Sequence, residues 1–218
     1  MIVYHPPPHT GLDMLHSDSS ILVVSKPAGL LSVPGRRADC QDCMITRVQR
    51  DYPEALIVHR LDMSTSGLMV MARDSKAQRH LNRQFEQRQV EKTYLAVVAG
   101  RVAPPAGMID LPLGRDWPNR PRQIVDHRVG KPSRTRYRVL VYNATDDTTH
   151  IELQPVTGRT HQLRVHMQAL GHPILGDDLY ADAIDRARAD RLLLHAEALR
   201  FTHPLTLESL AFSQAAPF

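Results

Sequence analysis

The chain has 218 residues, of which 42% are hydrophobic and 23% are charged, and its formal net charge is +4. This length and composition favour one domain with a substantial core over two independent ones. No apolar run approaches the roughly 20 residues that a membrane-spanning helix requires, and the first eight residues lack the basic start and apolar core of a secretory leader. We therefore expect a cytoplasmic protein without a membrane segment.

The first part of the chain predicts an arm, a buried strand and a short helix. Residues 1–18 are rich in Pro and His and predict an N-terminal arm or edge segment. Residues 20–25 predict a buried strand, which Lys26-Pro27-Ala28-Gly29 ends as a turn. Residues 36–43 predict a surface loop, and residues 44–50 a short helix.

Cys40 and Cys43 are the only cysteines of the chain. A zinc site needs four ligands, and no second Cys pair or nearby His pair supplies them. A redox pair is expected at a strand-to-helix junction of a thioredoxin-like unit, which the pattern does not show. We therefore expect two reduced surface thiols and no metal site.

The segment His59-Arg60-Leu61-Asp62-Met63-Ser64-Thr65-Ser66-Gly67 stands directly before the apolar run of residues 68–72. Polar and small residues against a buried strand predict a functional loop that the strand holds in place. A carboxylate there needs a partner, because burying an unpaired charge is costly. From the residues alone, Asp62 is either a reactive group or part of an Asx-type turn with Ser64 and Thr65.

A helix and a central strand follow. Asp74 or Ser75 can cap a helix whose buried face carries Ala77, Leu81 and Phe85 at a spacing of four. Residues 92–99 predict a strand that is apolar on both faces and stops at Gly100.

The middle of the chain is basic. Residues 102–107 predict a Pro-rich connection, and residues 116–121 a long loop that holds the only tryptophan, Trp117. A strand with one basic face is predicted by the alternation of Arg134, Arg136 and Arg138 with Thr135, Tyr137, Val139 and Val141. Residues 115–138 hold eight Lys or Arg against two Asp, a net charge of +6, so the rest of the chain carries −2. Such a stripe either binds a polyanion or is a solvated face.

The last third predicts one more strand, a helix and three short strands. Residues 151–156 form the strand. The helix runs from Thr160 to before Gly171, with Leu163, Met167 and Leu170 on its buried side and Arg164 on a neighbouring side. The final strands are residues 192–194, 199–202 and 210–213. Strands outnumber helices without regular alternation, so the fold class is α+β with a mixed, largely antiparallel sheet.

The motif around Asp62 resembles the active-site motif of the RluA family of pseudouridine synthases. Further matching segments follow in the family's order: Lys92-Thr93-Tyr94, Gly158 to His166, Gly176-Asp177 with Leu179-Tyr180, and Leu192 to Ala196. The resemblance implies one catalytic domain over residues 19–218, with a bent sheet, flanking helices and loops, and a central RNA-binding cleft. Many relatives carry an extra N-terminal S4 domain, for which residues 1–18 are too short.

The resemblance also implies a reaction and its residues. It predicts an isomerase that flips uridine out of RNA and converts it to pseudouridine without a cofactor, in 23S rRNA or a tRNA anticodon stem-loop or both. Asp62, Tyr94 and Arg164 are the implied catalytic residues, with Arg164 paired to the Asp62 carboxylate. The implied substrate-binding residues are Arg60, which fills the gap left by the flipped base, and His59, Thr65, Leu194, Arg120, Arg122 and Arg136.

The competing interpretation is a non-catalytic RNA-binding or ribosome-assembly module on the same fold. It would not require Asp62, Tyr94 and Arg164 together, and all three are present. We expect a monomer with RNA as its partner. The sequence does not choose the target uridine or the atom that Asp62 attacks.

Overall fold

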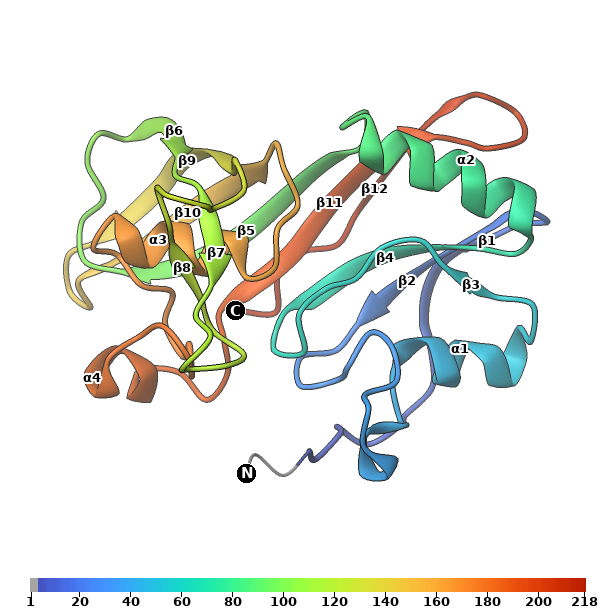
Figure 1. Ribbon diagram of the computed structural model, residues 1–218, viewed down its shortest axis with the longest axis horizontal. Helices are drawn as coiled ribbons and strands as arrows, with labels where there is room; N and C mark the ends of the chain where they lie inside the picture. Colours follow the sequence, from blue (N-terminus) through green and yellow to red (C-terminus); the bar gives the residue numbers. More distant parts are fainter. Residues whose placement is uncertain (1–3) are drawn as a thin grey trace. The chain divides into compact units, whose positions relative to one another are not determined.

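The computed structural model describes residues 4–218, and this part of the chain folds into two compact units (Figure 1). Unit 1 contains residues 4–92 and 196–217, and unit 2 contains residues 93–195 together with Phe218. The chain passes between the units within strands β5 (Glu91–Ala99) and β11 (Leu194–Thr202). The first three residues of the predicted N-terminal arm lie outside the described residues.

Unit 1 is built on a sheet with the strand order β1-β2-β4-β11, in which β3 pairs with β4 and β12 with β11. The pairs β1–β2, β2–β4, β3–β4 and β11–β12 are antiparallel. The remaining strands of this unit are β1 (Asp13–Ser17), β2 (Ile21–Lys26), β3 (Leu56–Ile57), β4 (Ser66–Ala72) and β12 (Ser209–Ser213). Every residue of β4 is buried, as the apolar run predicted.

Two helices of unit 1 confirm the sequence predictions, and a short 3₁₀ helix (Ala38–Cys40) precedes them. Helix α1 (Met44–Asp51) begins after Cys43, which is fully buried rather than exposed as expected. Helix α2 (Ser75–Glu86) is capped by Asp74, whose Oδ1 accepts hydrogen bonds from Lys76 N and Ala77 N. Its apolar face packs into the core of unit 1.

Unit 2 is built on the antiparallel order β5-β10-β9-β6, with a separate two-stranded hairpin. Its other sheet strands are β6 (Ala106–Asp110), β9 (Arg134–Asn143) and β10 (Thr148–Pro155). The hairpin joins β7 (Leu113–Arg115) to β8 (Gln123–Val125). The helices are α3 (Gln162–Ala169) and α4 (Ala183–Ala187).

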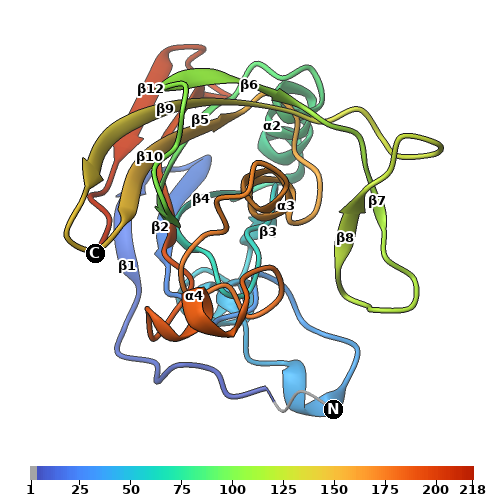
Figure 2. The same cartoon turned by 90° about the vertical axis from the view of Figure 1, so that its left-hand side faces the viewer.

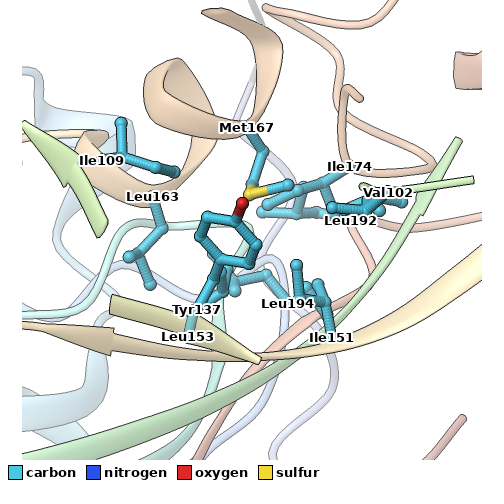
Figure 3. Packing of buried hydrophobic residues seen from close by; sticks show 12 residues of the cluster. Val102, Ile109, Tyr137, Ile151, Leu153, Leu163, Met167, Ile174, Leu192 and Leu194 are labelled. Atoms are coloured by element: carbon cyan, nitrogen blue, oxygen red, sulfur yellow. The ribbon is translucent and has the colours of Figure 1, made fainter. Parts of the chain in front are cut away.

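The core of unit 2 lies between its sheet and α3 (Figure 3). The side chains of Leu163 and Met167 extend from α3 toward Ile151 and Leu153 of β10. Tyr137 of β9 points toward Met167. The large, mostly antiparallel sheets and few helices confirm the α+β class.

Four further local predictions were wrong. The connection predicted at residues 102–107 ends in strand β6. In place of the two strands predicted at 192–194 and 199–202, the single strand β11 runs from Leu194 to Thr202, and residues 192 and 193 precede it. Leu170 is 38% exposed because it follows the last turn of α3. Val141 is 54% exposed because the pairing of β9 with β10 shifts by one residue between His150 and Ile151, which ends the alternation.

Candidate active site

In unit 1, Asp62 lies in a tight turn just before β4, and main-chain contacts fix this turn. Thr65 N donates to Asp62 O at 3.2 Å. On the other side of Asp62, the buried Ser32 hydroxyl donates to Leu61 O at 2.7 Å and accepts from Leu61 N at 3.1 Å. The residues that flank the carboxylate are therefore held through their backbone.

Lys26 is a buried residue beside this turn that sequence reasoning did not name as a site residue. Its side chain is fully buried, and Nζ donates to Pro27 O at 2.9 Å, Leu30 O at 2.7 Å and Met63 O at 3.0 Å. Gly29 N also donates to Met63 O, at 2.9 Å. A buried ammonium is tolerated when acceptors surround it, and here one acceptor belongs to the residue after Asp62. The sequence signal was a lysine between a buried strand and a Pro-Ala-Gly turn.

Gly67 lets the start of β4 approach β11 closely. Its φ is +109°, and a Cβ at this position would lie 2.6 Å from Ala196 N. Thr65 and Ser66, which precede it, are buried, whereas Arg60 is exposed. Among Arg60, Thr65 and Ser66, Arg60 therefore has the side chain that is most open to solvent.

The ring of His59 contacts strand β4 and helix α2. Nε2 accepts a hydrogen bond from Val70 N at 3.1 Å, and the ring stacks on Phe85 with centroids 4.7 Å apart. Burial, and secondly the positive charge of Lys92, lowers the pKa of His59 to about 3. The ring is therefore neutral at pH 7, as its acceptor role requires, and its predicted contact with RNA stays a prediction.

The pKa of His59 predicts how stability depends on pH. An unfolded histidine titrates near 6.5, so between pH 6.5 and about 3 the unfolded chain binds a proton that the folded chain does not. The unfolding free energy therefore carries no penalty from His59 above pH 6.5, and it decreases as the pH falls from 6.5 toward about 3. Compared with His59→Gln, the wild type should lose unfolding free energy more steeply below pH 6.5, by at most about 1.4 kcal/mol per pH unit. Urea unfolding of both proteins from pH 7.5 to 4.5 measures this, and parallel curves would contradict it.

In unit 2, Arg164 of α3 forms a buried two-point ion pair with Asp177. Arg164 Nε lies 2.8 Å from Asp177 Oδ2, and Nη2 lies 2.6 Å from Oδ1; the side chains are 3% and 0% exposed. Nη2 also reaches Asp178 Oδ1 at 3.0 Å. Asp177 Oδ1 accepts further hydrogen bonds from Leu179 N and Tyr180 N. Such planar, charge-assisted contacts fix the guanidinium in one orientation.

Asp177 was named in a motif, but its pairing with Arg164 was not foreseen. The partner that the resemblance implied, Asp62, belongs to unit 1, so that pairing stays a prediction. Two other predicted site residues also belong to unit 2. Leu194 is buried in the core cluster beside Ile151 (Figure 3), and Tyr94 is half-buried and packs against the same cluster.

The predicted basic stripe is also in unit 2. On β9 the side chains of Arg134, Arg136 and Arg138 are exposed, whereas the intervening Thr135 and Tyr137 are buried, which confirms the strand with one basic face. Arg138 is paired with Glu152 at 2.8 Å. Arg120 is exposed and Arg122 half-buried near the β7–β8 hairpin. Most of the stripe is therefore open to a polyanion.

If this stripe contacts phosphates, its arginines should set the salt dependence of RNA binding. Each phosphate contact removed should lower the slope of log affinity against log salt by about 0.7 to 0.9. We expect this for Arg120→Gln and Arg136→Gln. Arg138→Gln is the matched control on the same face, since Glu152 already compensates its charge. Unchanged slopes after replacing Arg120, Arg122 and Arg136 together would make the stripe a solvated face.

No metal site is evident in residues 4–218, where no group of three or more His, Cys, Asp or Glu side chains has a suitable arrangement. Both cysteines, Cys40 and Cys43, are free thiols. None of the helices in the described part of the chain has the length and apolar character needed to span a membrane.

Comparison with known proteins identifies the class. The family model for RNA pseudouridylate synthases matches residues 20–169. The chain therefore belongs to the RNA pseudouridylate synthase family, which confirms the predicted isomerase class.

Individual relatives match over nearly the whole chain. The dual-specificity RNA pseudouridine synthase RluA of Escherichia coli (strain K12) is 54% identical over 215 residues, which are 99% of this chain and 98% of the relative. The RluA protein of Vibrio parahaemolyticus is 51% identical over 94% of this chain and 83% of its own length. The solved structure of human RNA pseudouridylate synthase domain containing 1 is similar with a TM-score of 0.82 and 32% identity, covering 98% of this chain and 87% of that one.

Proposed function

We propose that this protein isomerises uridine to pseudouridine in two kinds of RNA, 23S ribosomal RNA and a tRNA anticodon stem-loop. The observation that carries the proposal is the 54% identity, over almost the full length of both chains, to a pseudouridine synthase named for dual specificity. The turn around Asp62 supports it, because a catalytic carboxylate must be held in one position. The cytoplasmic location and monomeric state expected from the sequence belong to this proposal.

The reaction itself needs no cofactor. The bond from C1′ to N1 of uridine breaks, the uracil turns, a bond from C1′ to C5 forms, N1 gains a proton, and C5 loses one. No electrons are exchanged with another molecule. Asp62 is the proposed carboxylate, which either attacks C1′ or C6 or stabilises a sugar cation. Because the reacting base must leave the stack, a few kcal/mol are needed to open the gap.

We propose that some of the other predicted site residues help to extrude the base and that others take part in the reaction. Arg60 is proposed to fill the gap, since its exposed planar guanidinium can stack on bases and bond to their edges. Tyr94 is proposed to stack on the extruded uracil and to receive the C5 proton. Arg164 is proposed to act with the Asp62 carboxylate, while Leu194, Thr65 and His59 shape the surroundings.

Release of the C5 hydrogen gives a direct test. Transcripts of a 23S rRNA fragment and of an anticodon stem-loop, each labelled with tritium at C5 of uridine, should lose tritium to water when incubated with the purified protein. Mapping the modified position identifies the target uridine in each. Tight binding of both RNAs without tritium release would support the alternative, a non-catalytic binding module, and overturn the proposal.

A further inference from the structure

Trp117 is a large apolar side chain that the structure leaves 58% exposed. It lies in the turn of the β7–β8 hairpin, which projects from unit 2 (Figure 2). The turn is built by internal contacts: Asp116 N donates to Arg122 O at 3.1 Å, and Arg122 N donates to Asn119 O at 3.0 Å. The Asn119 side chain donates to the Asp116 carboxylate at 3.1 and 3.0 Å. An exposed tryptophan in an ordered turn is a candidate contact surface.

The guanidinium groups of two arginines lie over the indole ring. Arg120 Cζ lies 4.0 Å from the ring centroid, and Arg115 Cζ lies 5.5 Å from it. These cation–π contacts restrict the ring, so that little side-chain freedom remains to be lost when a ligand binds. They also place positive charge over the ring of a tryptophan that is still 58% exposed. This combination suits a ligand that is flat, apolar on its faces and negatively charged beside them.

The hairpin is tied to the part of unit 2 that holds Arg164. Gln123 N, at the start of β8, donates to the hydroxyl of buried Tyr180 at 2.8 Å. The Arg164 guanidinium carbon lies 5.1 Å from the Tyr180 ring centroid, and His161 Nδ1 lies 2.7 Å from the Tyr180 hydroxyl. Trp117 therefore has a defined position relative to Arg164, within one compact unit.

We propose that Trp117 stacks on an unpaired base of the substrate RNA, with Arg115 and Arg120 beside the adjacent phosphates. The inference rests on the proposed function and adds the contact that selects single-stranded loop RNA over a duplex. Charge favours this occupant over an apolar protein surface or a lipid tail, because residues 115–138 carry a net +6. The base that stacks on Trp117 is a different nucleotide from the uridine that reacts, so Trp117 is a specificity-determining residue.

Intrinsic fluorescence tests this directly, because Trp117 is the only tryptophan of the chain. An anticodon stem-loop should quench its emission, with the same midpoint as binding followed by the anisotropy of labelled RNA. A fully paired duplex of equal length carries the charge without unpaired bases and should quench little. Unchanged emission at saturating stem-loop, or equal quenching by the duplex, would overturn the stacking.

Variants give an independent readout. Trp117→Ala should weaken stem-loop binding by about tenfold or more and duplex binding little, whereas Trp117→Phe should retain most of the affinity. Ile184→Ala, at another exposed apolar residue of unit 2, is the matched control. If Trp117→Ala binds the stem-loop as tightly as the wild type and releases tritium normally, this inference is overturned and the proposed function is not. Failure of the wild type to bind or convert any RNA would overturn the proposed function with it.

Discussion

Asp62→Asn should lower the rate of pseudouridine formation by about 10⁴-fold or more while leaving the fold and RNA affinity nearly unchanged. The rate falls because the amide cannot act as a nucleophile or stabilise positive charge as a carboxylate does. The fold is retained because the contacts that fix the turn use main-chain atoms of residues 61, 62 and 63. The change also removes a charge and no volume. Single-turnover rates at saturating RNA, measured beside affinity, separate the two effects.

The matched control is Asp51→Asn, which makes the same chemical change at the exposed end of α1 in the same unit. It should leave both rate and affinity at the wild-type level. A third variant, Lys26→Met, separates position from chemistry. It retains Asp62 but removes the ammonium that holds Met63 O, so its loss of rate should accompany a loss of stability. Appreciable turnover by Asp62→Asn would exclude this carboxylate as the essential group.

The features that sequence predicted well are those that depend on neighbours along the chain. The Asp74 cap of α2 is a hydrogen bond to the first turn of the helix. The spacing of Ala77, Leu81 and Phe85 is a pattern along the same helix. The basic face of β9 follows from alternation alone. Such patterns are set by local geometry, so a single sequence contains them.

Features that depend on a distant partner were missed. Strand β6 is short and carries mostly exposed side chains, so only its pairing with β9 makes it a strand. Lys26 is usually an exposed residue type, and its burial depends on carbonyl groups at residues 27, 30 and 63. Strand β11 was divided in two because His195 and Glu197 interrupt the apolar pattern. Pairing across the fold decided each case.

The candidate site divides in the same way. The family motifs predict Asp62, Tyr94 and Arg164 as catalytic residues without any knowledge of the fold, and these roles stay predictions. The motifs did not reveal what holds Arg164. The arginine and Asp177 are thirteen residues apart with a helix end between them, and three other acids, Asp178, Asp182 and Asp185, follow closely. The structure shows that Arg164 is paired with Asp177 at two points and with Asp178 at one.

Removing either partner of the Arg164–Asp177 pair should therefore destabilise the protein strongly. Arg164→Met leaves the fully buried Asp177 carboxylate without its counter-charge, which costs about 3–5 kcal/mol of unfolding free energy. Asp177→Asn leaves a buried guanidinium but keeps an oxygen for Leu179 N and Tyr180 N. The double variant has neither charge, so its loss should be smaller than the sum of the two, with a coupling of about 1–3 kcal/mol. Strict additivity in urea unfolding would show that the two charges do not stabilise one another.

Turnover then distinguishes a structural pair from a catalytic one, and unit 1 contains a matched control. Arg47 is 4% exposed and forms a similar two-point pair with Asp42, at 2.8 and 2.7 Å. Arg47→Met should destabilise the protein, but its folded fraction should turn over normally. Folded Arg164→Met should be slower by about a hundredfold or more. If Arg164 acts together with Asp62, Asp62→Asn combined with Arg164→Met should be barely slower than Asp62→Asn alone. Near-normal turnover with weakened RNA binding in Arg164→Met would instead make Arg164 a phosphate contact.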